Sequence, residues 1–341
     1  MGNKHFLNSL RAIAVLVVVS IAWSGSTYAG NGEGEDFVFF GDSLSDTGNR
    51  YFFEGTLNTP PYSALPDQGL IPSAPYAIGG PTFSNGAVFP EYIARALGVA
   101  GLSQPASRSE GVAANYAYGG ARAANSLAPN ANRNLDQQVM DYIAAGVRPS
   151  AIHIVAIGGN DLGVALRAAA PGFPPVDPAL VIEDAVAGMF TQLLTLQAYG
   201  AQRFLIVTSA NPGLIPAFGG SAAAIEGGYV LTSIFNCAVV GEGAGRPCGA
   251  LGVPGLLPTV KQALEAGGAE VLVFEGQALF DGLYFNPTAF GLTNVTDACI
   301  KPNVAPYRCD SPDEYLFWDG THPTKKVHRL IGETIAAFLE E

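Results

Sequence analysis

Cysteine is scarce in this sequence and does not occur before Cys237, one of only four cysteines in 341 residues. A lipid-modified cysteine near the N-terminus is therefore excluded. The cysteines also lack the short Cys-x-x-Cys spacing, and no histidine lies close to them in the sequence, so a zinc site is not favoured. We expect no metal ion in this protein.

Basic residues are also few. The chain has 17 Lys and Arg against 29 Asp and Glu, a formal net charge of −12, which argues against nucleic acid as a partner. There is no internal repeat, and no G-x-G-x-x-G is followed by a suitably placed acidic residue, so a dinucleotide cofactor is not supported. We expect no cofactor. With 48% hydrophobic residues, the chain is rich enough in apolar side chains to form one substantial globular domain.

Residues 1–29 have the pattern of a secretory signal peptide. Lys4 and Arg11 precede an apolar run from Ala12 to Trp23, and small residues follow up to Ala29. The alternative is a membrane anchor, but the run is shorter than the roughly 20 residues of a spanning helix. No later segment looks apolar for long enough to span a bilayer. We therefore expect cleavage near Ala29, a mature domain over residues 30–341 without a transmembrane segment, and a secreted or periplasmic location in a bacterium.

Short β-rich runs alternate with amphipathic stretches along the mature chain. We expect strands at 37–40, 113–118, 152–157, 203–208 and 271–274, and helices at 88–97, 135–145, 180–198, about 222–239, 260–266, and from Pro323 to near the C-terminus. This alternation predicts a parallel sheet with helices on both faces, in one domain. The segment 50–86 is rich in proline and aromatic residues and too long for a simple connection, so we expect it to fold over the site.

A serine follows the first predicted strand in "DFVFFGDSLSDTGN". The ordinary explanation is a turn in which Ser43 caps a helix. Alternatively, the turn presents the Ser43 hydroxyl at the carboxyl edge of a parallel sheet, where α/β proteins bind ligands. A serine is a poor nucleophile alone, so this hypothesis requires a base, a group that orients the base, and donors for an oxyanion.

Three histidines outside the leader are candidates for that base. His153 lies within an apolar strand and is expected to be a core residue, and His328 is expected on the solvated surface of the last helix. His322 lies in "FWDGTHPTKK", where Asp319 precedes it by three residues and can orient its imidazole across a tight turn. The alternative is that Asp319 only caps the turn.

Candidate oxyanion donors follow two other predicted strands. "IVAIGGNDLG" places the Asn160 side chain after one strand, and "ANYAYGGARAA" places Gly119 and Gly120 after another. Either segment alone could be an ordinary turn or a packing site.

The four cysteines form two locally spaced pairs, which for an exported chain predict disulfides between Cys237 and Cys248 and between Cys299 and Cys309.

Taken together, FGDSLSDTGN, NYAYGGARA, IGGND and DGTHPT closely resemble the blocks of the GDSL, or SGNH, hydrolase family, in the same order and over nearly all of the mature chain. Secreted bacterial lipases and esterases, including autotransporter esterase passenger domains, are most similar. The resemblance implies a three-layer α/β/α sandwich with a five-stranded parallel sheet. It implies Ser43 as nucleophile, His322 as base and Asp319 as its orienting residue. The implied oxyanion donors are the N–H groups of Ser43 and Gly120 and the side chain of Asn160, with Gly119 as the fallback.

One segment departs from the family pattern, because Pro81-Thr82 stand where Gly-Arg is usual. The sequence also lacks the G-x-S-x-G elbow of α/β-hydrolases. We expect an esterase or lipase that hydrolyses small-molecule or lipid esters through an acyl-enzyme. The expected lining of the acyl site is Tyr51, Phe52, Phe53, Tyr62 and Phe83. The alternatives are acyl transfer, polysaccharide O-deacetylation, and a non-catalytic lipid- or glycan-binding module.

Overall fold

The structure is a computed structural model that divides into two units, Met1–Glu33 and Gly34–Glu341. The residues described are 35–54, 81–108, 113–125, 133–169, 176–243, 246, 248–251, 258–301 and 308–341. The predicted leader, most of segment 50–86 and the expected lining residue Tyr62 therefore lie outside the described residues.

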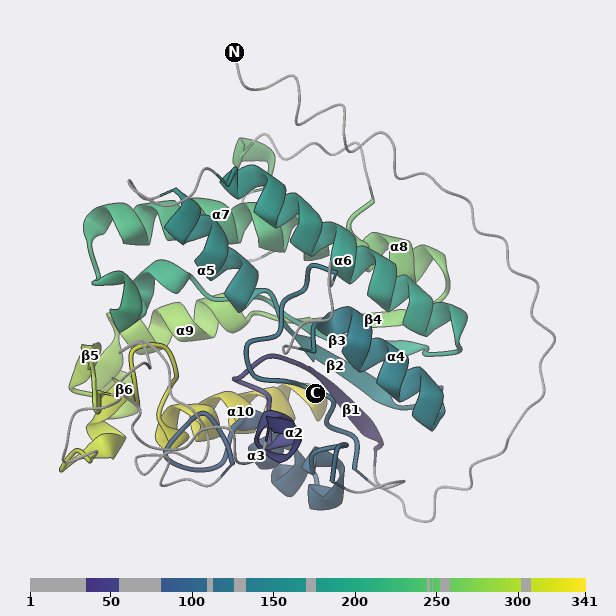
Figure 1. Cartoon of the computed structure of the whole chain (residues 1–341), viewed down its shortest axis with the longest axis horizontal. Helices are drawn as coiled ribbons and strands as arrows, with labels where there is room; N and C mark the ends of the chain where they lie inside the picture. Colours follow the sequence, from purple (N-terminus) through teal and green to yellow (C-terminus); the bar gives the residue numbers. More distant parts are fainter. Residues whose placement is uncertain are drawn as a thin grey trace. The chain divides into compact units, whose positions relative to one another are not determined.

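A parallel sheet runs through this unit in the order β1-β2-β3-β4 (Figure 1). Its strands are β1 (Phe37–Gly41), β2 (Ile152–Ala156), β3 (Arg203–Val207) and β4 (Glu270–Phe274). Every residue of β1 is buried, as expected for a parallel sheet covered on both faces. The predicted α/β fold with a parallel sheet is confirmed, and each of these strands begins within one residue of its predicted start.

The fifth predicted strand, 113–118, is not a regular strand. It lies beside β1 and exchanges backbone hydrogen bonds with Phe39, which forms an isolated parallel bridge with Asn115. The Tyr118 N–H donates to the Gly41 carbonyl at 3.1 Å, but the Gly41 N–H donates to the Gln138 side chain at 3.0 Å instead of to this segment, so no regular ladder forms. The regular sheet therefore has four strands among the described residues, and 113–118 borders it.

Helices cover both faces of the sheet (Figure 1). They are α2 (Asn49–Glu54), α3 (Phe89–Ala96), α4 (Leu135–Ala145), α5 (Gly159–Ala168), α6 (Pro178–Ala198), α7 (Ala222–Val240), α8 (Val260–Ala266), α9 (Gly276–Phe285) and α10 (Lys325–Leu339). One hydrophobic cluster packs the helices α4, α5, α6, α7 and α8 against one face of the sheet. A second cluster joins α3 and α10 to the other face. This gives the predicted three layers.

The last helix begins two residues later than predicted. Pro323 forms an isolated antiparallel bridge with Phe317 and so belongs to extended chain, and Thr324 is the N-cap of α10. Two short strands, β5 (Asn294–Ala298) and β6 (Tyr315–Phe317), form a small separate sheet just before this turn. The sequence analysis did not predict them, since β5 contains Asn, Thr and Asp and has no buried face.

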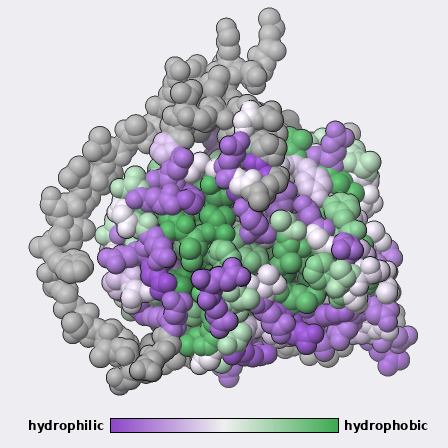
Figure 2. Space-filling view, turned by 180° about the vertical axis from the view of Figure 1, so that it is seen from behind, coloured by the Kyte–Doolittle hydropathy of each residue, from purple (hydrophilic) through white to green (hydrophobic). Residues whose placement is uncertain are grey.

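Helices α6 and α7 are long and apolar enough to span a membrane by length and composition alone. The expectation that no later segment has this property was wrong. Both helices contribute buried residues to the cluster against the sheet, including Leu193 and Phe235, which accounts for their hydropathy without a membrane. Hydrophobic residues also reach the surface, where Figure 2 shows them gathered on one face among hydrophilic residues.

The cysteines are joined in the predicted pairs, Cys237 with Cys248 and Cys299 with Cys309. Within the described part of the chain, no group of three or more His, Cys, Asp and Glu side chains is arranged to hold a metal ion.

Candidate active site

The carboxyl ends of the four parallel strands meet at one edge of the sheet. After β1 the chain passes to segment 113–118 on one side of β1 and then returns to β2 on its other side. Ligands of open α/β sheets bind where the strand order reverses in this way. Ser43 lies two residues after β1, directly at this point.

A continuous chain of hydrogen bonds connects the three residues of the predicted triad. The Nε2 atom of His322 lies 2.8 Å from the Ser43 Oγ, and its Nδ1 lies 2.9 Å from Asp319 Oδ2. Asp319 Oδ1 also accepts the backbone N–H of His322 at 2.6 Å, which fixes the turn between them. Asp319 is fully buried and His322 and Ser43 nearly so. The structure thus brings together Ser43, His322 and Asp319 from positions far apart in the sequence.

The His322 ring packs against Phe83, with 5.2 Å between the ring centroids. Phe83 is buried and approaches the Gly119 backbone so closely that a Cβ at that position would collide with its ring. Gly119 is therefore required for packing. Phe83, expected to line the acyl site, instead supports the side of the imidazole.

Each of the three predicted oxyanion donors has an N–H group without an acceptor among the described residues. No acceptor among the described residues takes the backbone N–H of Ser43 or of Gly120. Gly120 has a positive φ of 80°, which glycine adopts without strain. Asn160 uses one amide N–H to bind the Ala121 carbonyl at 2.8 Å and retains the other. Gly119 cannot serve as the fallback donor, because its N–H donates to Asp46 at 2.8 Å.

Two buried carboxylates that the sequence analysis did not single out hold the loop that carries Gly120. Asp46 accepts the N–H of Gly119 on one side of the loop. Asp161 binds the Arg122 guanidinium at 2.9 Å and the Ala123 N–H at 2.8 Å on the other. Burial raises the pKa of both carboxyls, that of Asp46 to about 6. Asp46 lies in FGDSLSDTGN and Asp161 in IGGND, each shortly after an apolar run. That position was the sequence signal that could have identified them as buried carboxylates.

Asp42 is a further buried carboxyl, one residue before Ser43. Burial raises its pKa to about 6, and the hydrogen bond from the Leu44 N–H and the positive charge available on His322 oppose that rise. A proton on Asp42 near pH 6 would weaken the negative charge beside the nucleophile.

A cavity of about 190 Å³ extends from Ser43 and Asn160 along the edge of the sheet. Its walls are mainly apolar and come from the ends of β2 and β3, from the segment 208–218 that follows β3, and from α5, α9 and α10. They include Ile157, Val207, Ile215, Phe218, Leu279, Phe280 and Ile331. None of the described residues expected to line the acyl site, Tyr51, Phe52, Phe53 and Phe83, lies in these walls. Phe52 and Phe53 are exposed on α2.

The two remaining histidines are both fully buried. His153 is a core residue as predicted, bound to the Tyr142 hydroxyl and the Arg203 carbonyl. His328 was predicted to be on the surface, which is wrong: it lies in the cavity wall, on the same face of α10 as the buried Ile335. Neither of its ring nitrogens has a partner among the described residues, and burial lowers its pKa to about 3.

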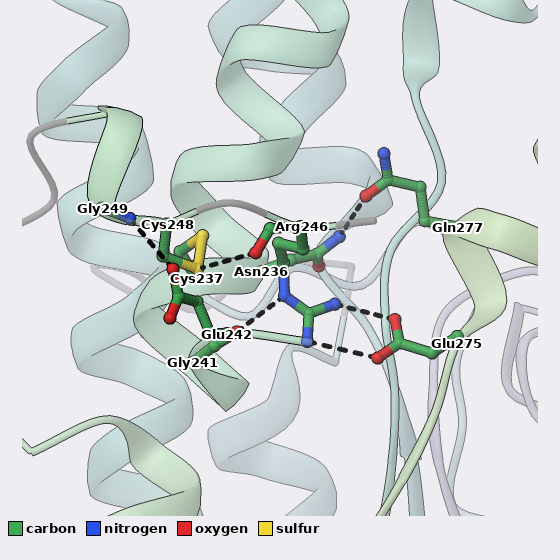
Figure 3. Close-up of a disulfide and its surroundings, with 9 residues drawn as sticks. All are labelled: Asn236, Cys237, Gly241, Glu242, Arg246, Cys248, Gly249, Glu275 and Gln277. Carbon is green, nitrogen blue, oxygen red and sulfur yellow. Dashed lines mark hydrogen bonds and ion pairs between the residues drawn. A yellow bond between two sulfur atoms is a disulfide. The ribbon is translucent and has the colours of Figure 1, made fainter. Parts of the chain in front are cut away.

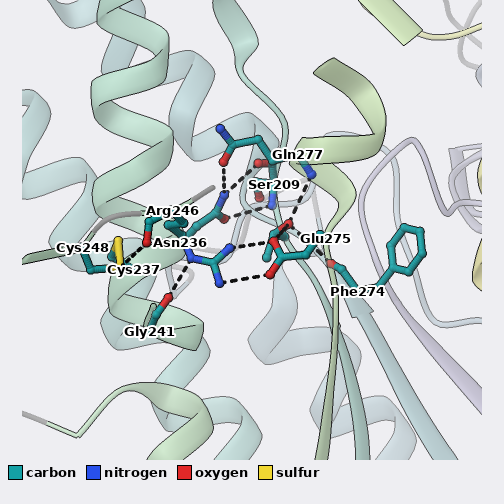
Figure 4. Close-up of polar contacts among 10 residues, drawn as sticks. Ser209, Asn236, Cys237, Gly241, Arg246, Cys248, Phe274, Glu275 and Gln277 are labelled. Atoms are coloured by element: carbon teal, nitrogen blue, oxygen red, sulfur yellow. Dashed lines mark hydrogen bonds and ion pairs between the residues drawn. A yellow bond between two sulfur atoms is a disulfide. The ribbon is translucent and has the colours of Figure 1, made fainter. Parts of the chain in front are cut away.

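A polar network surrounds the first disulfide (Figure 3). Arg246, two residues before Cys248, forms a two-pronged ion pair with Glu275 at 2.7 and 3.2 Å. Asn236, which precedes Cys237, exchanges two 3.0 Å hydrogen bonds with the backbone of Ser209 in the cavity wall (Figure 4). The disulfide, α7 and the end of β3 are thus held as one unit.

Comparison with known proteins gives a consistent set of relatives. GDSL esterase/lipase EXL4 of Arabidopsis thaliana is 26% identical, over 95% of this chain and 96% of its own length. GDSL esterase/lipase LTL1 of the same plant is 25% identical, over 86% and 84%. Lipase 1 of Photorhabdus luminescens is 23% identical over 95% of this chain and 52% of its own length.

The family model of the GDSL-like Lipase/Acylhydrolase matches residues 37–335, which is most of the chain and includes every residue of the hydrogen-bonded triad. The triad lies at the edge of the sheet, as the motifs FGDSLSDTGN and DGTHPT predicted. The order of strands and helices also agrees with the resemblance inferred from the sequence. This chain belongs to the GDSL-like lipase/acylhydrolase family.

Proposed function

We propose that this protein is a serine esterase or lipase that hydrolyses carboxylic esters through an acyl-enzyme on Ser43. The observation that carries the proposal is the chain of hydrogen bonds from Ser43 Oγ through His322 to Asp319. The family match and the relatives named as esterases and lipases support it.

In the first half of the reaction, Ser43 Oγ attacks the ester carbonyl carbon while His322 Nε2 takes the hydroxyl proton. Asp319 accepts the Nδ1–H of the imidazole and so keeps Nε2 free to act as base. The negative oxygen of the tetrahedral intermediate is held by the N–H groups of Ser43 and Gly120 and by the Asn160 amide. The intermediate then collapses, and the alcohol leaves with the proton from His322.

In the second half, a water molecule attacks the acylated Ser43 and His322 again serves as base. The same donors hold the second oxyanion, and its collapse releases the carboxylic acid and restores the serine. No step requires a metal or cofactor.

Three alternatives use the same surface. Acyl transfer differs only in the acceptor that attacks the acyl-enzyme, so products formed with a competing alcohol distinguish it. Polysaccharide O-deacetylation is distinguished by activity on acetylated glycans and none on longer p-nitrophenyl esters. A binding module without catalysis is disfavoured by the complete triad.

The disulfides support an oxidising compartment outside the cytoplasm. We propose, as part of the same function, that residues 1–29 direct export and are removed near Ala29, leaving one hydrolase domain from residue 30 to 341. N-terminal sequencing of the exported protein tests this boundary.

The direct test of the function is labelling with a fluorophosphonate, which reacts with activated serines. Peptide mapping should find the label on Ser43 alone, and Ser43→Ala should lose both label and turnover, about 10⁶-fold in kcat. Ser45→Ala, at a neighbouring buried serine not bonded to His322, is the matched control and should still be labelled at Ser43. Labelling elsewhere, or activity in Ser43→Ala, would contradict the proposal.

A further inference from the structure

One cation in the cavity has no carboxylate partner. Among the described residues, seven arginines form ion pairs with acidic side chains: Arg95, Arg122, Arg133, Arg148, Arg203, Arg246 and Arg329. Arg167 is half-buried and lines the cavity, yet no acidic side chain in the described residues pairs with it. In a protein with 29 acidic and 17 basic residues, an unpaired arginine at this place is unexpected.

The position of Arg167 on α5 directs it toward the reaction centre. Asn160, Gly163 and Arg167 are spaced as neighbours on one face of a helix, and all three line the cavity. The guanidinium lies over Gly163, where an added Cβ would be 3.4 Å from Nη2. Its Cζ is 5.0 Å from the centre of the Phe218 ring. Gly163 lies one helical turn from Asn160 on this face, and its missing side chain leaves room for the guanidinium above it.

The other polar groups of the cavity leave Arg167 as its positive pole. His328, on the α10 side, is neutral because burial lowers its pKa to about 3. Asp42, the acidic side chain in the walls, lies at the Ser43 end. Burial lowers the pKa of Arg167 as well, which reflects the cost of withdrawing an unpaired cation from water. A ligand anion would offset that cost.

We propose that the cavity takes esters that carry a carboxylate or phosphate group a few bonds from the scissile carbonyl, and that Arg167 binds this anion. The proposal rests on the proposed esterase function and specifies its substrate class. Three residues of helix separate Gly163 from Asn160, about 4.5 Å. The length of a hydrogen bond is added to this separation, and the sum is divided by roughly 1.2 Å per bond of extended chain. The anion then lies about four to six bonds from the carbonyl carbon.

Two matched pairs of esters test the proposal and distinguish the source of the anion. The first pair is the p-nitrophenyl hemiester of adipic acid and p-nitrophenyl hexanoate, which differ by a carboxylate on the acyl side. The second is monohexanoylglycerol phosphate and monohexanoylglycerol, which differ by a phosphate on the alcohol side. For each pair, the measured quantity is the ratio of kcat/KM for the anionic ester to that for the neutral ester.

Arg167→Gln should lower this ratio about 10- to 100-fold in at least one pair, the range expected for a lost charge-assisted hydrogen bond. Arg167→Lys should recover part of it, because lysine keeps the charge without the planar fork. Arg203→Gln is the control: Arg203 begins β3, at the opposite edge of the sheet, and its loss should leave the ratio within about two-fold. A change in the first pair alone places the anion on the acyl side, and in the second alone on the alcohol side.

An unchanged ratio in both pairs, or an equal loss for both members of each pair, overturns the assignment of Arg167. Failure of the esterase function gives a different result, namely no hydrolysis of any of the four esters and no fluorophosphonate label on Ser43. A readout without turnover covers that case: adipate should raise the thermal midpoint of the wild type and not that of Arg167→Gln. Equal shifts in the two proteins would overturn the proposal.

Discussion

The two ends of the cavity differ in how their polar groups are satisfied. At the reaction centre, Asp319, His322 and Ser43 are linked to one another, and the loop beside them is fixed by Asp46 and Asp161. Two other groups in the cavity wall have no such links: among the described residues, Arg167 has no acidic partner and His328 has no hydrogen-bond partner. Buried polar groups in native proteins are normally paired. The difference separates groups whose geometry must be fixed before substrate arrives from groups that a substrate or water can satisfy.

Among variants that keep the Ser43 nucleophile, the largest effect is expected from breaking the paired end at Asp319. Asp319→Asn should lower kcat by about 10⁴-fold, because an amide does not fix the imidazole tautomer that leaves Nε2 as a base. The thermal midpoint, measured on the same preparation, shows whether the turn around His322 has survived. A kcat within about ten-fold of the wild type, in a folded variant, would contradict the orienting role.

A smaller loss is expected from Asn160, which lies between the two ends. Asn160→Ala should lower kcat by about 10² to 10³-fold with little change in KM, since its free N–H matters mainly when the oxyanion forms. Asn160→Asp should be at least as damaging, because a carboxylate repels the oxyanion. If Asn160 only holds the Ala121 carbonyl, alanine should instead lower the thermal midpoint and leave kcat within a few-fold.

The smallest effect is expected at His328, one of the unpaired groups, and it concerns the free energy of unfolding. The pKa of His328 is about 3 in the folded protein and about 6.5 when unfolded, so between these values only the unfolded chain binds the proton. Stability is therefore lost as pH falls below about 6.5. His328→Met should remove this loss, so between pH 7.5 and pH 4.5 the variant should lose roughly 2.7 kcal/mol less unfolding free energy than the wild type.

Denaturant unfolding of the two proteins at both pH values measures that difference. The other shifted groups are present in both and cancel: His153 with a pKa of about 4, and Asp42 and Asp46 with pKa values of about 6. Equal losses of unfolding free energy in wild type and variant would show that His328 is protonated or paired in the folded state.

The paired end could be predicted from the sequence, whereas the cavity could not. Asp319 and His322 lie on one turn, and Ser43 and Asn160 each follow a buried strand, so local patterns indicate their place at the sheet edge. The apolar residues of the cavity wall, such as Ile157 and Val207, have the same sequence pattern as core residues. The acyl site was therefore predicted in the aromatic segment after Ser43 instead.

His328 shows the same limit for a polar residue. Its neighbours Lys326 and Arg329 suggested a solvated helix face, but the orientation of α10 is set by Ile331 and Ile335, which pack toward the sheet. Arg167 could have been noticed from its spacing to Asn160. That its charge lacks a partner depends on which acidic residues tertiary folding brings near it, and no local pattern contains that information.

The separation of Ser43 from His322 by 279 residues bears on how the protein is made. The nucleophile leaves the ribosome early, and its base is among the last residues to follow. His322 reaches Ser43 only when the chain after β4 has folded and α10 has packed against α3. A growing or truncated chain therefore holds a serine without its base, so hydrolytic activity begins only when synthesis and folding of the whole domain are complete.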